Sequence, residues 1–369
     1  MTTGLVSRLI AGAALATAML ASAAPAHADS LEAEFDKAFS PSAAAARSQL
    51  QAPAKSAPLK VQPSTESAKR VLPSSVRPFV AAGAPRPYGS GLDAQLAMHA
   101  DPSLGRIGVA AIDLSTGRTV SVLGDTPFPM ASTSKVAIAA TFLAGVDDGR
   151  FSLDASYPLM VPVKSKKYST TVAPVRPGQM MTGRQLVERA LIYSDNPATD
   201  ALLAVVGGPA AVNRWMRATG NTGMRIDRDI ATLVRDDGEF NPATTIDERD
   251  SATPLAMARL LSGLYQGRWL SAGSRAFLIS TMERCRTGKR RMPALLPSDA
   301  RIAHKTGTLS NTASDVGLVR TPDGQVYAIA VYVTGQGGHA GRDAKIAAIT
   351  RTIYDGYTGE GSVYRVAAQ

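Results

Sequence analysis

Cysteine, histidine and aromatic residues are all scarce in this chain of 369 residues. It contains one cysteine, Cys285, and four histidines with neither H-x-x-x-H nor H-x-H spacing, and aromatic residues make up 5%. An internal disulfide framework and a cysteine-built metal site are therefore excluded, and a zinc hydrolase is disfavoured. We expect no cofactor and no metal. We interpret Cys285 as a half-buried structural residue, with a reactive thiol as the alternative.

Long apolar runs are also missing after the first 28 residues. The one early run, residues 9–21, follows Arg8 and is too short to span a bilayer stably. It ends near Ala26-His27-Ala28, a small-x-small cleavage pattern. We predict a signal peptide over residues 1–28 and an exported protein, periplasmic or secreted, with no membrane span after the signal is removed.

Residues 29–90 are rich in proline and alanine, and proline interrupts any helix beyond a short start at residues 31–39. We predict a disordered linker or tail here. A solvated spacer is the favoured interpretation, and a weak contact with an anionic cell envelope is the alternative. The net charge of +10 would suit a nucleic-acid partner, but export and the scarcity of aromatics argue against one.

From residue 91 to 369 the pattern becomes that of one folded domain. Strands are predicted near both ends, at residues 107–114, 119–123, 303–308, 315–320 and 326–333. Helices are predicted between them and at the end, at residues 135–146, 183–193, 199–206, 209–219, 254–266, 274–283 and 342–354. We therefore predict an α+β fold, with one antiparallel sheet of about five strands built from both ends of the domain and flanked by helices.

The first chemical motif is Ser132-Thr-Ser-Lys135, at the predicted start of a helix. Its spacing puts the serine hydroxyl and the lysine amine on one helical face, about 5–6 Å apart at Cβ. The helix N-terminus adds positive potential and free N–H groups. A lysine that passes its proton to a neighbour there can activate Ser132 as a nucleophile.

Two further motifs carry polar groups. Ser194-Asp-Asn196 follows a predicted helix, where the hydroxyl can shuttle a proton and the amide can orient a substrate carbonyl. Lys305-Thr-Gly307 ends a predicted strand. The glycine lets a ligand approach the backbone, Lys305 and Thr306 can bind a carboxylate, and the next N–H can act as an oxyanion donor. Each motif alone is weak, and a turn or a surface helix explains it equally well.

Together, in the order S-x-x-K, S-D-N and K-T-G, the motifs resemble the signature of class A serine β-lactamases. The resemblance covers about residues 91–357 and includes residues 128–135, 207–212, 250–257, 287–291 and 303–308. It implies the β-lactamase/DD-peptidase-like α/β sandwich with an inserted all-helical subdomain.

The resemblance also implies roles for individual residues. Ser132 would be acylated by the lactam carbonyl, and the backbone amides of Ser132 and Thr308 would form the oxyanion hole. Lys135 and Ser194 would relay protons, and Asn196 would hold the amide side chain of the substrate. The groups that would bind its carboxylate are Lys305, Thr306, Gly307, Thr308 and Arg291. For Arg291, which matches an arginine that some members place fourteen residues before the strand lysine, a solvated turn is the alternative.

Arg228 and Asp250 resemble the ion pair that closes the omega loop of the family. A family glutamate two residues after the arginine activates the hydrolytic water, and that position here is Ile230. Counting back from Asp250 gives Asp237 instead, with Asn241 four residues later as the family pattern requires and about seven extra residues at 229–236. We adopt the second count and expect Asp237 and Asn241 to position the water.

The exchange of glutamate for aspartate has a physical consequence. Its carboxylate is set back by roughly one bond length, ~1.5 Å, and a general base must lie within hydrogen-bond reach of its water. Deacylation would be slow unless the longer loop compensates. Glu239 and Asp229 are alternative bases, and Asp237 as a plain solvated acid is the remaining interpretation. Asp200, six residues after Ser194 where asparagine is commoner in the family, is expected to support the loop.

The leading hypothesis is an exported, monomeric β-lactamase that opens the β-lactam amide bond through a Ser132 acyl-enzyme and so confers antibiotic resistance. The alternative is a penicillin-binding or D-alanyl-D-alanine peptidase-like hydrolase that acylates but deacylates slowly. A third hypothesis is a non-enzymatic β-lactam or peptidoglycan sensor. The expected partner is a small-molecule β-lactam substrate, which fits the positive charge of the domain.

Overall fold

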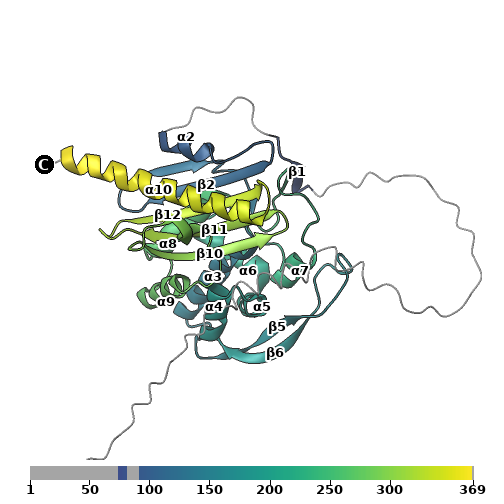
Figure 1. Cartoon of the computed structure of the whole chain (residues 1–369). Helices are drawn as coiled ribbons and strands as arrows, with labels where there is room; N and C mark the ends of the chain where they lie inside the picture. Colours follow the sequence, from purple (N-terminus) through teal and green to yellow (C-terminus); the bar gives the residue numbers. More distant parts are fainter. Residues whose placement is uncertain (1–73, 81–90, 368–369) are drawn as a thin grey trace, which may run out of the picture. The chain divides into compact units, whose positions relative to one another are not determined.

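A five-stranded antiparallel sheet organises the protein in a computed structural model that describes residues 74–80 and 91–367, with side chains to residue 359 (Figure 1). The strand order is β10-β11-β12-β2-β3. β2 (Gly105–Asp113) and β3 (Thr119–Val122) precede the helices, whereas β10 (Arg301–Leu309), β11 (Thr312–Arg320) and β12 (Val326–Gly335) follow them. The predicted α+β class, with one sheet closed by both ends of the domain, is confirmed.

Both faces of this sheet are covered, because its central strands are apolar on both sides. Val109 and Val331 pack on one face with α2 (Gly91–Ala97) and α10 (His339–Ala367). The alternate residues, such as Ala110 and Ala330, belong to the core on the other face, which includes α8 (Pro254–Tyr265). This alternation follows from the two-residue period of a strand. Figure 1 shows α10 lying across the sheet.

The helical subdomain is built around a central helix that is buried on nearly all sides. This helix is α3 (Lys135–Asp147), in which residues 135–145 are all buried; a helix that is apolar all round is typical of such a position. Its core also includes residues of the surrounding helices. Those helices are α4 (Gly183–Ile192), α5 (Asn196–Val206), α6 (Gly208–Ala218) and α9 (Ala272–Glu283).

Several short elements were not predicted. The longest is the hairpin of β5 (Ser156–Pro162) and β6 (Val175–Thr182), and the residues predicted as an insertion contain the helix α7 (Ile230–Arg235). The others are the helix α2, the strands β1 (Val76–Pro78) with β8 (Thr245–Asp247) and β9 (Ser251–Ala252) with β4 (Phe128–Pro129) and β7 (Met224–Arg225), and the 3-10 turns η2 (Ala131–Ser134) and η3 (Met292–Leu295).

Two expectations about the ends of the domain need correction. Residues 76–78 fall in the predicted linker, yet they pair with β8 and so belong to the folded part. The last helix does not end at residue 354 but continues to Ala367. Gly356 and Gly359 lower its intrinsic helix propensity, whereas Tyr357 anchors it by donating a hydrogen bond to the Ala111 carbonyl at 2.9 Å.

The predicted signal peptide, the predicted helix at 31–39 and most of the linker lie outside the described residues. Within the described ranges, every helix is too short or too polar to cross a bilayer.

Candidate active site

Ser132 lies in η2, which leads directly into α3. The hydroxyls of the next two residues bind the backbone of the turn: Thr133 donates to the Met130 carbonyl at 2.7 Å and Ser134 to the Ala131 carbonyl at 2.9 Å. Ser132 remains partly exposed, although these neighbours are buried. The turn thus fixes the backbone and leaves Ser132 as its accessible hydroxyl.

Lys135 connects this turn to the second motif. Its side chain is fully buried, and Nζ donates to Asn196 Oδ1 at 2.7 Å, to Ser194 Oγ at 3.2 Å and to the Ser194 carbonyl. Burial and then the positive charge of Lys305 lower the pKa of Lys135 well below its usual value, although Asp195 and Asp200 act in the opposite direction. A lysine in this environment can exist as a neutral amine that accepts a proton.

Ser194 connects the second motif to the third. It lies between α4 and α5 with a left-handed φ of 60°, and the following residue, Asp195, caps α5 by accepting a hydrogen bond from the Ala198 N–H at 2.8 Å. Lys305 Nζ lies 2.9 Å from Ser194 Oγ, which also accepts from Lys135. The structure therefore brings the three motifs together at one hydroxyl group.

The third motif packs against the turn that carries Ser132. This contact explains why residue 307 is a glycine, and the explanation differs from the predicted approach of a ligand. A Cβ at residue 307 would lie 2.6 Å from the Met130 carbonyl oxygen and 2.5 Å from Ser314 Oγ. The group that approaches closely is thus the chain itself. Thr306 is buried, and its hydroxyl lies 2.6 Å from Thr287 Oγ1. Thr287 was not predicted to have this structural role.

Arg291 is fully buried, so the interpretation as a solvated turn is wrong. Its Nη2 donates to Thr308 Oγ1 at 2.8 Å, Nη1 to the Gly307 carbonyl at 3.0 Å, and Nε to Asp343 Oδ1 at 2.7 Å. The guanidinium therefore supports the end of the third motif. Asp343 was missed by sequence reasoning because it lies on α10, 52 residues away, and belongs to no motif.

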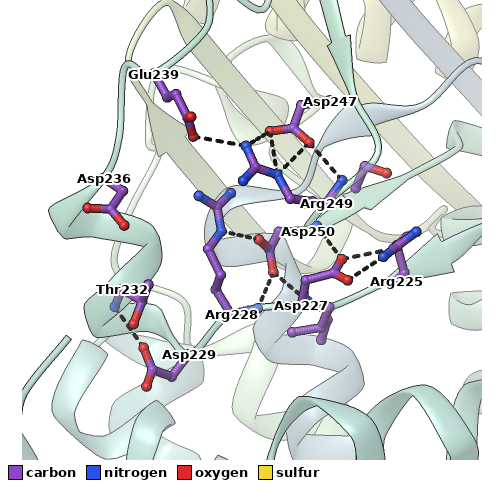
Figure 2. A network of polar contacts seen from close by, with 12 residues as sticks. Arg225, Asp227, Arg228, Asp229, Thr232, Asp236, Glu239, Asp247, Arg249 and Asp250 are labelled. Atoms are coloured by element: carbon purple, nitrogen blue, oxygen red, sulfur yellow. Dashed lines mark hydrogen bonds and ion pairs between the residues drawn. The ribbon is translucent and has the colours of Figure 1, made fainter. Parts of the chain in front are cut away.

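The loop from Arg228 to Asp250 is held closed by ion pairs, which Figure 2 shows. Arg228 Nε lies 2.6 Å from Asp250 Oδ2, and the backbone N–H groups of Asp227 and Arg228 donate to Asp250 Oδ1 at 2.8 and 3.0 Å. Arg249 pairs with Asp247 at 2.7 Å and with Glu239 at 2.9 Å. The pair expected to close the loop is therefore present.

Asp237 and Asn241 both contact the turn between β10 and β11. Asp237 Oδ2 accepts from the Ser310 N–H at 2.8 Å, and Asn241 Oδ1 accepts from Asn311 Nδ2 at 2.9 Å. Burial raises the pKa of Asp237. Asp237 also lines a cavity of about 60 Å³. Among the described residues, no hydrogen bond joins Asp237 to the cluster of Lys135, Ser194 and Lys305, called the lysine cluster below.

The other acids of this region hold the loop. Asp229 caps α7 by accepting from the Thr232 N–H at 2.7 Å, and Glu239 is paired as described above. Asp200 accepts from the N–H groups of Ile230 and Ala231 at 2.7 and 2.9 Å, so its predicted role in supporting the loop is confirmed. Burial raises the pKa of Asp200 to about 7. α7 is thereby anchored to the helix that begins with the second motif.

No group of three or more histidine, cysteine, aspartate or glutamate side chains in the described ranges is arranged to hold a metal ion. The polar centre consists instead of two lysines, hydroxyl groups, an amide and backbone carbonyls. Such groups are suited to nucleophilic attack with proton relay and to binding an anionic substrate.

Comparison with known proteins assigns the fold and this centre to a family. Residues 92–357 match the model of the beta-lactamase enzyme family. The chain is 34% identical over 263 residues to the carbapenem-hydrolyzing beta-lactamase KPC of Klebsiella oxytoca, covering 68% of this chain and 84% of that protein. It is 32% identical over 234 residues to beta-lactamase AER-1 of Aeromonas hydrophila, covering 62% and 73%.

Solved structures agree. A class A β-lactamase reconstructed as the last common ancestor of Gram-negative bacteria superposes with a TM-score of 0.62 at 37% identity, covering 73% of this chain and 100% of that one. A β-lactamase from Chitinophaga pinensis gives a TM-score of 0.64 at 30% identity, covering 73% and 100%. The chain belongs to the beta-lactamase enzyme family, as a class A serine β-lactamase that hydrolyses β-lactams.

Proposed function

We propose that the enzyme opens the β-lactam amide through an acyl-enzyme on Ser132. The observation that carries this proposal is the position of Lys135. It is buried three residues after the accessible serine and is hydrogen-bonded to Ser194 and Asn196 of the second motif. With its lowered pKa, the neutral amine takes the proton of Ser132 as the oxygen attacks the lactam carbonyl. The amides of Ser132 and Thr308 stabilise the oxyanion.

Ser194 then protonates the leaving nitrogen. Its oxygen accepts from both Lys135 and Lys305, which leaves its own proton for the third direction. As the lactam C–N bond breaks, Ser194 gives this proton to nitrogen and takes one from Lys135. The net result is transfer of the Ser132 proton to the leaving group.

Substrate orientation uses the remaining groups. Asn196 Oδ1 accepts a hydrogen bond from Lys135. The amide N–H groups of Asn196 are therefore the donors for the carbonyl of the substrate side chain. Lys305 and the Gly307–Thr308 end of β10 bind the carboxylate. Arg291 adds positive potential and fixes the Thr308 hydroxyl, so we assign it a positioning role. Because Thr306 Oγ1 bonds to Thr287, its contribution is to hold the strand.

We assign the deacylation base to Asp237, with Asn241 beside it. Burial raises its pKa, as suits a general base. Its cavity of about 60 Å³ is also lined by Pro129, three residues before the nucleophile. This space is large enough to admit water beside Asp237.

A second candidate is an enzyme that acylates readily and deacylates slowly. It is favoured by the engagement of the loop acids elsewhere: Asp237 with Ser310, Glu239 with Arg249, and Asp229 with its own helix. Turnover of a chromogenic cephalosporin over many equivalents distinguishes the two. Sustained turnover that Asp237→Ala abolishes, with Glu239→Ala as the matched control, supports the first candidate. A stoichiometric burst with a persistent mass adduct on Ser132 supports the second.

One substitution tests both candidates together. Ser132→Ala removes the nucleophile, and the expected outcome is no adduct and no turnover. Retained activity in this variant would overturn the mechanism.

The proposal includes export and a monomeric state, with residues 1–28 removed and residues 29–90 as the spacer. Its basis is the sequence pattern of the first 90 residues. Cell fractionation with N-terminal sequencing of the mature protein tests the cleavage site, and sedimentation tests the monomer.

A further inference from the structure

A second polar cluster lies beside the third motif and is not used by the proposed mechanism. It consists of Cys285 after α9, His304 on β10 and Asp315 on β11. His304 Nδ1 lies 2.9 and 3.0 Å from the two carboxylate oxygens of Asp315, and the His304 and Cys285 side chains are close enough for each to shift the pKa of the other. A thiol, an imidazole and a carboxylate in this order form the arrangement that activates a cysteine.

The charges of the cluster favour a thiolate paired with an imidazolium. Burial alone would lower the pKa of His304, but Asp315 and Cys285 outweigh it and raise that pKa to about 10. For Cys285, burial would raise the pKa, but His304 and Lys305 outweigh it and lower that pKa to about 7. His304 and Asp315 are both buried, so solvent screens their interaction little.

This thiol is connected to the third motif by two short contacts. Cys285 Sγ lies 3.4 Å from Thr287 Oγ1, and Thr287 Oγ1 lies 2.6 Å from Thr306 Oγ1. His304 is also the residue before Lys305 on the same strand. A group added to Sγ competes for the space of Thr287 and thereby disturbs the strand that binds the substrate carboxylate.

The charges around Cys285 favour one class of thiol reagent. Cys285 is partly exposed, and the chain contains no second cysteine for an internal disulfide. Three exposed cations follow within five residues, Arg286, Lys289 and Arg290. This positive surface favours the approach of anionic molecules.

We propose that the Cys285–His304–Asp315 cluster is a site of thiol modification by small anionic disulfides, and that the adduct slows β-lactam turnover. The thiolate of Cys285 attacks one sulfur of the disulfide. A Cys285–sulfur bond forms, the disulfide bond of the reagent breaks, and the second sulfur leaves as a thiolate that takes a proton from water. Cysteine is oxidised and the reagent is reduced to one thiol. The effect on turnover rests on the proposed role of the Lys305 strand.

The test treats the full chain with the anionic disulfide dithiobis-nitrobenzoate and, in parallel, with cationic cystamine. We expect one adduct per chain with either reagent, a rate that falls with added salt for the anionic reagent and rises for the cationic one, a drop in cephalosporin turnover of about tenfold in step with the adduct, and recovery with dithiothreitol. The Cys285→Ser variant should hydrolyse the cephalosporin at the normal rate and should react with neither reagent.

Replacement of the imidazole gives the sharper test. His304→Gln should slow the thiol reaction about tenfold at about pH 6, because fewer thiols are ionised although each thiolate is more nucleophilic. His99→Gln, outside the cluster, is the matched control. If His304→Gln is unfolded by circular dichroism, Asp315→Asn replaces it.

The activated thiol, the preference for anions and the effect on turnover can each be overturned by a separate outcome. An unreactive wild-type thiol, or equal rates in the His304 variant, would overturn the activated cluster. The same dependence of the rate on salt for both reagents would overturn the preference for anions, and an adduct that leaves turnover unchanged would overturn regulation. Absence of turnover in untreated enzyme would count against the proposed function instead, because mass spectrometry detects the adduct independently.

Discussion

The lysine cluster around Ser194 and the loop from Arg228 to Asp250 both hold buried charge, but they compensate it differently. Lys135 donates to a hydroxyl, an amide oxygen and a carbonyl, and it forms no ion pair within the described residues. In the loop, by contrast, Arg228 and Arg249 each face carboxylates at 2.6 to 2.9 Å.

This difference distinguishes the lysine cluster, which performs the chemistry, from the loop, which closes over it. Burial and the positive charge of Lys305 lower the pKa of Lys135, and its neutral partners do not offset this as carboxylates would, so the neutral amine is accessible and can accept a proton. Carboxylates cancel the charge of the arginines, so the loop gains a fixed shape and keeps little net potential. The substitutions below remove charges from one region or the other, and each has a defined expectation.

The largest effect is expected from Lys135→Met, which removes the amine at nearly constant side-chain volume. Loss of the proton acceptor should lower the rate of acylation by about 10²–10⁴-fold. Rapid-mixing kinetics with a chromogenic cephalosporin measure this rate. Lys166→Met, at an exposed lysine, is the matched control and should leave it unchanged. Acylation at the wild-type rate in Lys135→Met would show that the lysine cluster does not drive the chemistry.

Arg228→Met should act on stability instead. Removal of one partner of a largely buried pair costs about 3–5 kcal/mol, and we expect the lower end because Asp250 retains two backbone N–H donors. Burial raises the pKa of Asp250 while Arg228 lowers it, so the variant raises it further and its deficit should shrink as the pH falls. Urea unfolding at two pH values measures this.

The control for Arg228 is the exposed pair of Arg150 and Asp148, whose side chains are 56% and 62% exposed. Arg150→Met should change the free energy of unfolding by less than about 1 kcal/mol. Equal costs for the two arginine variants would contradict the distinction between a loop closed by buried charge and an ordinary surface pair.

Asp200 lies between the two regions, and its titration sharpens the comparison. Burial raises its pKa from 3.8 to about 7, so the folded state binds the proton more tightly than the unfolded state. The stability of the wild type should therefore fall as the pH rises from about 4 to about 7 and then level off. In Asp200→Asn this component should be missing. A difference between the two proteins that is constant over this range would contradict the assignment.

The parts that sequence reasoning anticipated are those in which a local pattern has one solution. S-x-x-K, S-D-N and K-T-G carry their own spacing and local structure, and the strands near both ends include short apolar runs, as a sheet covered on both faces requires. The closing pair of Arg228 and Asp250 followed from family resemblance, because insertions between two residues do not prevent their contact.

The parts that it missed depend on contacts between distant residues. Nothing near Gly307 in the sequence indicates that the Met130 carbonyl fills the space beside it. The contacts of Arg291 with Asp343 and of Thr306 with Thr287 are equally non-local. Cys285 was interpreted as structural because its activating partners are 19 and 30 residues away on separate strands. The length of the loop left Asp237 ambiguous, since α7 occupies the extra residues.

The smallest effect is expected within the loop, from Glu239→Gln. Arg249 keeps Asp247 at 2.7 Å and can still donate to the new amide oxygen, so the ion pair between Arg249 and residue 239 is weakened and not abolished. The free energy of unfolding should change by less than about 1 kcal/mol, and this change should diminish at high salt, because exposed pairs are weak and screened. Turnover should stay within about twofold, because Glu239 is assigned to closing the loop. Loss of a catalytic base would instead lower turnover by about 10²–10⁴-fold. A loss of turnover at unchanged stability would move the deacylation base from Asp237 to Glu239, and with it the boundary between the region that performs the chemistry and the region that closes over it.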